Sequence, residues 1–143
     1  MRLKHRRSQW IQHPLFGGAV VGAAPTVSTL SPADNAVDVA INATLVVTFS
    51  ENVFLSAASR TVTLKKTSDN STIDSWNVAS DGGSGAGQCE ITNSTELTLH
   101  LSANLANSIE YYVVWDSGVV DDATGTPVAA LSVTTTWSFT TVA

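Results

Sequence analysis

Cysteine, methionine and proline are scarce in this chain, and so is charge. The 143 residues include one cysteine, one methionine and four prolines, and only 13% of them are charged. A single thiol, Cys89, excludes a disulfide within the chain. No apolar run reaches the ~20 residues that a membrane-spanning helix requires. Few stretches have the Glu/Lys/Leu pattern of surface helices, so we do not expect a helical protein.

Serine, threonine, alanine, valine and asparagine are abundant instead, and 43% of the residues are hydrophobic. This composition is typical of a β-rich extracellular or particle-associated protein and not of a disordered tail. The length suits one domain and is too short for two domains of ordinary size. We therefore expect a single β-rich domain.

The basic residues are concentrated at the start of the chain. The formal net charge is −5, but four of the seven basic residues lie within the first seven positions: Arg2, Lys4, Arg6 and Arg7. The rest of the chain has twelve acidic and three basic residues, which gives it a charge of −9. Large apolar residues follow the basic ones, namely Trp10, Ile11, Leu15 and Phe16. Because charge steers association and apolar side chains anchor it, residues 1–25 are predicted to be a docking arm. A solvated basic terminus without a partner is the alternative.

Basic residues followed by LFGGAVVGAA (residues 15–24) superficially match the plan of a secretory signal peptide. The apolar run is short and broken by glycines, and Pro25 directly follows Ala24, the only small residue suited to cleavage. We therefore expect no signal peptide and interpret the chain as a stand-alone product that begins at Met1.

From Thr26 onward the pattern changes to short alternating segments separated by turn residues. The expected strands are residues 26–30, 37–41 (continuing the first after a kink), 44–50, 60–67, 72–78, 88–92, 96–101, 111–115 and 133–141. A crossing segment at 51–59 allows one helical turn, and the glycine-rich residues 80–87 form a loop. We predict about seven to nine strands in a sandwich of two antiparallel sheets over residues 26–143.

Three phrases of the sequence resemble one module family. They are LSPADNAVDVAINATLVVTFSENV (residues 30–53), LANSIEYYVVWDSGVVDDATGTPV (105–128) and WSFTT (137–141). In this order and at these distances they resemble the bacterial Ig-like domains of the SbsA type, which are modules of cell-surface, secreted and virion proteins. The resemblance implies an all-β, Ig-like Greek-key sandwich that holds, spaces and adheres, with no catalytic residues and no cofactor. It leaves out the basic N-terminal arm, and residues 121–127 are one residue longer than usual.

Two positions within these phrases have a direct structural interpretation. Tyr111 opens a strand after a corner, so its hydroxyl is placed to bond to backbone across that corner, as the tyrosine corner of Greek-key sandwiches does. Asp121 and Gly125 suit a turn that needs a side-chain cap and a left-handed residue.

Residues capable of other chemistry are present but not in informative patterns. Asp121 and Asp122, with Asp116 nearby, are calcium candidates, although their spacing matches no known calcium loop and turn capping is favoured. Cys89 and the three histidines lack the spacing of a catalytic or zinc site, and His100 is expected to face solvent. The aromatic residues Trp76, Trp115, Trp137 and Tyr112 either form a sugar-stacking platform or, as we favour, pack in the core.

These observations lead to two expectations about function. The first is a non-enzymatic accessory protein of a bacteriophage virion, either a capsid decoration protein or a protein of the tail or neck. It is expected to be homo-oligomeric or present in multiple copies in the particle and to dock through its arm on capsid or tail subunits. The alternative is an adhesion module of a bacterial cell surface or a secreted protein. Weak binding to glycans or cell surfaces fits both. Nucleic acid is not an expected partner, because the acidic body repels phosphates.

Overall fold

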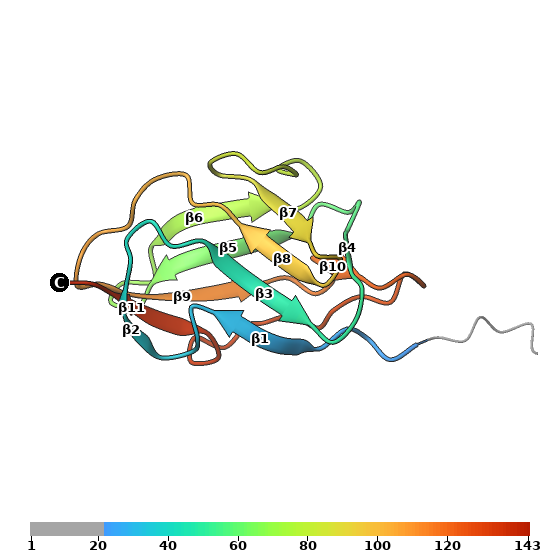
Figure 1. The fold of residues 1–143 in the computed structure, drawn as a ribbon, viewed down its shortest axis with the longest axis horizontal. Helices are drawn as coiled ribbons and strands as arrows, with labels where there is room; N and C mark the ends of the chain where they lie inside the picture. The colour runs from blue at the N-terminus through green and yellow to red at the C-terminus, as the bar shows by residue number, and fades with distance from the viewer. Residues whose placement is uncertain (1–21) are drawn as a thin grey trace, which may run out of the picture.

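The computed structural model describes residues 22–143, and in this range the chain forms eleven strands and no helix (Figure 1). The strands are Val27–Ser31 (β1), Ala36–Val39 (β2), Leu45–Phe49 (β3), Phe54–Leu55 (β4), Thr61–Lys66 (β5), Thr72–Asn77 (β6), Cys89–Thr92 (β7), Glu96–Leu99 (β8), Glu110–Trp115 (β9), Val120–Asp121 (β10) and Ser138–Thr141 (β11). The docking residues expected within 1–21 lie outside the described range.

Nine of these strands build two sheets, and the remaining pair, β4 and β10, forms a small ribbon of its own. The first sheet has the order β1-β3-β8-β7 and the second has the order β2-β11-β9-β5-β6. This is the strand arrangement of an Ig-like Greek-key sandwich. The predicted fold class is confirmed, and the structure adds one parallel pair, β2 with β11, to the antiparallel ones.

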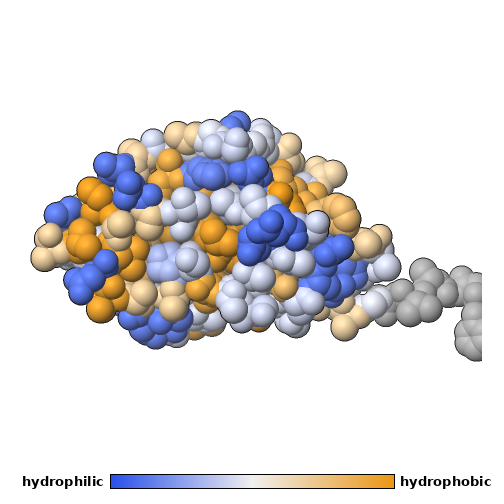
Figure 2. Space-filling model, in the orientation of Figure 1, coloured by the Kyte–Doolittle hydropathy of each residue, from blue (hydrophilic) through white to orange (hydrophobic). Residues whose placement is uncertain are grey.

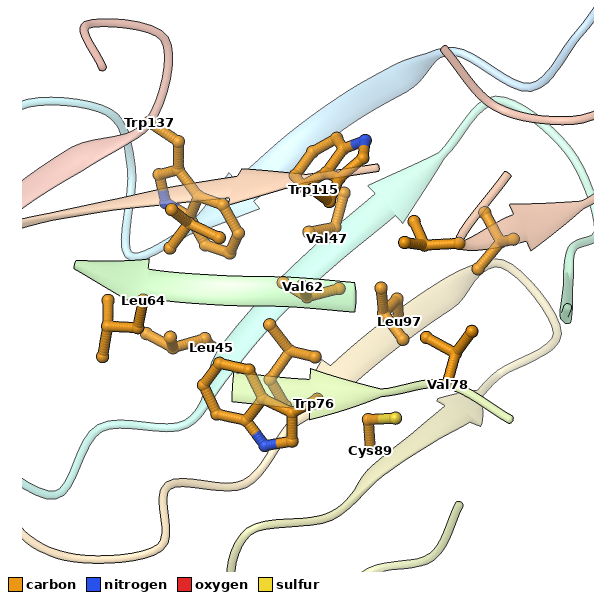
Figure 3. Close-up of a cluster of buried hydrophobic side chains, with 14 of the residues drawn as sticks. Leu45, Val47, Val62, Leu64, Trp76, Val78, Cys89, Leu97, Trp115 and Trp137 are labelled. Carbon is orange, nitrogen blue, oxygen red and sulfur yellow. The ribbon is translucent and has the colours of Figure 1, made fainter. Parts of the chain in front are cut away.

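The core lies between the sheets because alternate residues of each strand point inward. In β3, Leu45 and Val47 are fully buried and Phe49 nearly so, as their alternation predicts. Val62 and Leu64 of β5 are also fully buried and meet the first sheet from the opposite side (Figure 3). Burial of such side chains supplies most of the free energy that favours folding.

Three tryptophans lie in this core, and each indole nitrogen has a backbone partner. Trp76 donates to the carbonyl of His100, Trp115 to that of Ala129, and Trp137 to that of Pro32, at 2.8 to 3.0 Å. These bonds satisfy the polar atom of a large buried ring, which would otherwise lose its hydration without compensation.

Cys89 lies in the same core, beside Trp76 and Val78 in Figure 3, and its side chain is fully buried. Burial raises the pKa of the thiol to about 11, with a smaller contribution from the negative charge of Asp81. A thiol of this kind is a small apolar core residue and not a nucleophile.

The tyrosine corner predicted for Tyr111 is present. The backbone N–H of Ala106 donates to the Tyr111 hydroxyl at 3.1 Å, and the ring packs against Phe139 with centroids 6.0 Å apart. The corner thus fastens the connection between β8 and β9 to the strand that follows it.

Replacing Tyr111 by phenylalanine is expected to lower the free energy of unfolding by about 1 kcal/mol, since it removes one hydrogen bond and keeps the packing. Urea denaturation measures the loss, and hydrogen exchange should show faster exchange at the N–H of Ala106. Tyr112→Phe is the matched control, because the Tyr112 hydroxyl donates to Asn70 in a different turn. Unchanged exchange at Ala106 in Tyr111→Phe would contradict the assigned corner.

Two stretches differ from the sequence interpretation. Residues 51–59 contain the short strand β4, paired with β10, where a helical turn was allowed. Residues 36–39 do not continue β1 but cross to the other sheet. In each case the pairing partner, which the local pattern does not specify, decided the outcome.

Candidate functional site

The acidic residues Asp116, Asp121 and Asp122 lie at the end of the sandwich where the described chain starts. A side-chain atom added at Gly22 would lie 3.4 Å from the Asp122 carboxylate, and Pro25 is buried nearby in sequence. The fold therefore brings the entry of the domain to the turn that the sequence marked as a calcium candidate. The C-terminus lies at the opposite end of the long axis (Figure 1).

Asp122 closes the 122–126 turn. Its Oδ1 accepts hydrogen bonds from the backbone N–H of Thr126 at 2.7 Å and from both the N–H and the hydroxyl of Thr124 at 2.8 Å. The bond from Thr126, helped by those from Thr124, holds the pKa of Asp122 below its ordinary value, although burial opposes them. Gly125 completes the turn with a φ of 82°, a conformation that favours glycine. The Asp122 carboxylate thus caps the turn, so turn capping was the right role for this acidic pair. The assignment of the cap to Asp121 was wrong by one residue, because Asp121 belongs to β10 and the turn bonds end on its neighbour.

The lowered pKa makes this turn sensitive to acid. A carboxylate whose folded pKa lies below its unfolded value stabilises the fold above the unfolded value, and this stabilisation disappears as the pH falls through the folded pKa. We expect Asp122→Asn to be less stable than the unchanged chain at neutral pH and to lose less stability between about pH 5 and pH 2. Urea midpoints across that range measure both effects.

Asp121→Asn serves as the control, because the hydrogen bonds of this turn end on Asp122 and not on its neighbour. If the two variants have the same pH profile, Asp122 is not the acid-sensitive cap.

Asp116 and Asp121 border a polar groove next to this turn. Asp116 accepts a hydrogen bond from the N–H of Thr61 at 2.9 Å, and Arg60 lines the same groove. Gly118 also lines the groove, and its φ of 76° is a conformation that favours glycine. Between residues 22 and 143 no three His, Cys, Asp or Glu side chains gather as metal ligands would. The geometry therefore gives calcium binding at Asp121 and Asp122 no further support.

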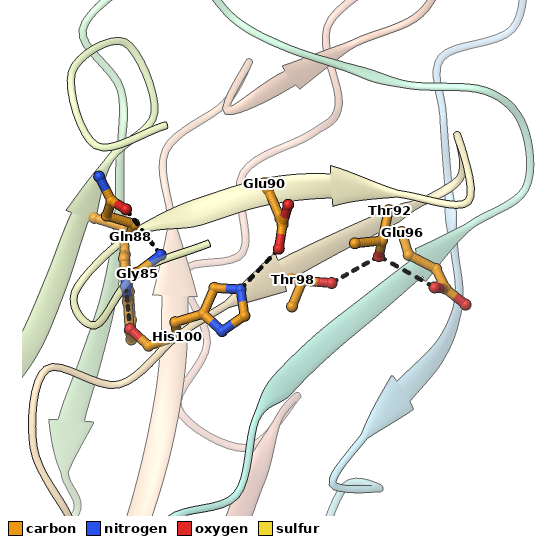
Figure 4. A network of polar contacts seen from close by, with 8 residues as sticks. Gly85, Gln88, Glu90, Thr92, Glu96, Thr98 and His100 are labelled. Atoms are coloured by element: carbon orange, nitrogen blue, oxygen red, sulfur yellow. Dashed lines mark hydrogen bonds and ion pairs between the residues drawn. The ribbon is translucent and has the colours of Figure 1, made fainter. Parts of the chain in front are cut away.

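A second polar cluster lies on the outer face of β7 and β8 (Figure 4). His100 Nε2 lies 3.0 Å from Glu90 Oε1, and the hydroxyls of Thr92 and Thr98 lie 2.8 Å apart. His100 is on the outer face as predicted, but it is half-buried and paired. The sequence analysis missed Glu90 as its partner because a β-hairpin register, and not sequence spacing, places the two together.

The aromatic residues do not form a sugar-stacking platform. Trp76, Trp115 and Trp137 are core residues, at most 5% exposed. Tyr112 borders a groove of about 260 Å³ on the outer face of β5 and β9. It is only 4% exposed, and its hydroxyl is engaged with Asn70. No aromatic ring of this set therefore offers an open face to a ligand.

The surface shows no large apolar patch on the face drawn in Figure 2, where hydrophilic and hydrophobic residues are interspersed. The large apolar side chains that are exposed come from separate parts of the chain: Val27, Val37, Phe54, Ile73 and Val133. In residues 22–143 there is also no helix long and apolar enough to cross a membrane. The described residues thus form a closed core, and the face drawn in Figure 2 has a mixed surface.

Comparison with known proteins identifies the class. The family model described as bacterial Ig-like domain matches residues 21–141, and the chain belongs to that family. No curated protein sequence is similar to it at a significant level.

Two solved structures share the fold at low sequence identity. CopC from Methylosinus trichosporium OB3b superposes with a TM-score of 0.55 at 16% identity, over 82% of this chain and 93% of that one. The S-layer protein SbsC superposes with a TM-score of 0.50 at 19% identity, over 84% of this chain but only 14% of that one. At this level of identity the two structures support the Ig-like fold and nothing finer.

Proposed function

We propose that this protein is a non-catalytic structural module of a bacterial cell surface or of a secreted protein, which holds and spaces neighbouring parts of an assembly. The observation that carries the proposal is the architecture of the bacterial Ig-like domain itself. Its core is closed, its two ends leave from opposite ends of the long axis (Figure 1), and the carboxylates of Asp116 and Asp122 accept backbone hydrogen bonds. Such a unit sets the distance between the parts that are attached at its two ends.

Two further observations support a cell-surface or secreted setting. The family is that of bacterial Ig-like domains, and an S-layer protein contains a domain of similar fold as a small part of its length. The described residues contain twelve acidic and three basic side chains, which makes the body strongly acidic. Net charge of this size keeps a module soluble and apart from other acidic surfaces.

The test is localisation in the organism that encodes the chain. Intact cells are treated with protease, and the protein is followed by antibody in the cell-surface, culture-medium and cytoplasmic fractions, with one marker protein for each fraction. We expect the protein at the surface or in the medium and lost from the surface after protease treatment. Recovery in the protease-protected cytoplasmic fraction alone would overturn the proposal.

A second candidate, favoured by the charge distribution, is an accessory protein of a bacteriophage particle that docks through residues 1–25. Four positive charges precede an acidic body, which suits an arm that binds a different, acidic subunit. Co-sedimentation with assembled particles, with and without residues 1–25, tests this candidate. Association that depends on the arm favours the particle, whereas two identical free monomers favour the surface module.

Mass spectrometry of the native protein gives an independent test between the cell-surface module and the phage accessory protein. An N-terminus created by cleavage near residues 15–25 would favour export and contradict the expectation that no signal peptide is present. An intact Met1 would leave the arm in place for docking.

A further inference from the structure

The two ends of the described chain leave the sandwich at opposite ends of its long axis (Figure 1). At the entry, Thr26 and Ser50 bond to each other through the Thr26 carbonyl and N–H, at 2.9 and 3.1 Å. At the exit, the N–H of Val142 donates to the carbonyl of Val39 at 2.9 Å. A pull on the two neighbours of this module therefore acts along its length.

Such a pull enters the sandwich through β1 and β11. β1 is an edge strand, bonded on one side only to β3, and its ladder is interrupted by a bulge between Val27 and Thr29. Four of its five residues are exposed. Once β1 yields, the load passes to β2, which lies alongside β11.

β2 and β11 run in parallel, with Ala36 opposite Phe139 and Val39 opposite Thr141. β2 is pulled from its first residue and β11 from its last, so the two strands are driven past each other in opposite directions. Every hydrogen bond between them then carries load at the same time. Strands pulled apart sideways, in contrast, break their bonds one after another.

Residues 32–35, which connect β1 to β2, reinforce this pair. The carbonyl of Pro32 accepts from the Trp137 indole at 2.8 Å, Asp34 Oδ1 accepts from the N–H of Ser138 at 2.9 Å, and the N–H of Asn35 donates to the Ser138 carbonyl at 2.7 Å. Trp137 itself is fully buried. These bonds tie the start of β2 to the start of β11 and are partly shielded from competing water.

We propose that β2, β11 and residues 32–35 form a mechanical clamp that resists extension of the domain when its two ends are pulled apart. This inference rests on the proposed structural role and adds a specific one: the module bears load between its neighbours. The clamp predicts that the force needed to unfold the domain depends on the direction of pulling and on the hydrogen bonds between β2 and β11. It does not predict that this force follows the free energy of unfolding.

Single-molecule force spectroscopy of the full chain tests both dependences. In the first geometry the handles are attached at the two termini. In the second, one handle is attached through Ser68→Cys and the other at the C-terminus. Thr67 bonds to Glu110, which pairs with Thr140 of β11, so both attachment points lie at one end of the second sheet and the strands are peeled apart. The buried Cys89 does not compete for the handle, because its side chain is not accessible to a reagent in the folded protein.

We expect the unfolding force between the termini to be roughly two-fold higher than in the peeling geometry, because forced unfolding follows the barrier along the direction pulled. Equal forces in the two geometries would overturn the clamp. This comparison leaves every residue of the clamp unchanged, so it does not depend on whether a clamp variant folds.

A matched pair of proline variants tests whether the unfolding force depends on the β2–β11 pair. Val142→Pro removes the N–H that bonds to Val39 one residue after β11, and Thr67→Pro removes the N–H that bonds to Glu110 one residue after β5. We expect both to lower the urea midpoint, but only Val142→Pro to lower the force between the termini. The same force loss in both variants, or in neither, would contradict the clamp. A cytoplasmic location with a strong clamp would instead refute only the proposed setting.

Discussion

Trp137→Ala is expected to destabilise the domain by about 3–5 kcal/mol, a large part of the roughly 5–15 kcal/mol that holds a typical domain folded. The indole is fully buried and lies against Trp115 in an edge-to-face arrangement, with ring centroids 6.3 Å apart. Its removal leaves a cavity between the sheets and leaves the Pro32 carbonyl without its donor. The residue therefore joins the core to the segment between β1 and β2.

Thermal and urea denaturation measure this loss, and Trp137→Phe is the control that separates its two causes. Phenylalanine keeps most of the apolar volume and removes only the indole N–H, so we expect an intermediate loss. A loss for phenylalanine equal to that for alanine would show that the bond to Pro32 matters more than the packing. A loss below about 1 kcal/mol for alanine would contradict the burial of this ring.

Val62→Lys is expected to prevent folding under ordinary conditions, because it places an unpaired charge in the core at a cost of about 5 kcal/mol in addition to the lost apolar burial. Val62 is fully buried in the middle of the second sheet, opposite Trp115 on one side and Trp76 on the other. Circular dichroism and size-exclusion chromatography of the expressed protein check the outcome.

The control is one residue away on the same strand. Thr63 points to the outer face beside Val114, so Thr63→Lys is expected to change stability by no more than about 0.5 kcal/mol. The two variants carry the same new charge and differ only in the face of the sheet. Similar stabilities for both would contradict the inward and outward assignment of β5.

The mechanical resistance of this module and its location in the cell are tested by separate experiments. The proposed β2–β11 clamp predicts resistance to force in one direction wherever the protein is found, whereas the proposed surface setting depends on export of the chain. Measuring both establishes whether a mechanically resistant module is placed where neighbouring parts of an assembly pull on it.

The sequence by itself determined the fold class and the face of most strands. Alternation of apolar and polar residues is a local property, because successive side chains of a strand point to opposite sides. Leu45, Val47 and Phe49 are therefore buried as predicted, and so are Val62 and Leu64. The tyrosine corner was also predictable, since Tyr111 bonds to a backbone group only five residues away.

Only the tertiary structure decided which strands became neighbours and what the polar residues do. β2 does not belong to the sheet of β1 but pairs in parallel with β11, although Ala36 and Phe139 are far apart in the sequence. The apolar and polar pattern of a strand does not specify which strand it pairs with. The contact between Glu90 and His100 is equally hard to predict, because the β7–β8 register brings the two side chains together. Asp34 became a contact of Ser138 for the same reason. These non-local pairings follow from the way the whole core closes, and they are what the proposed clamp depends on.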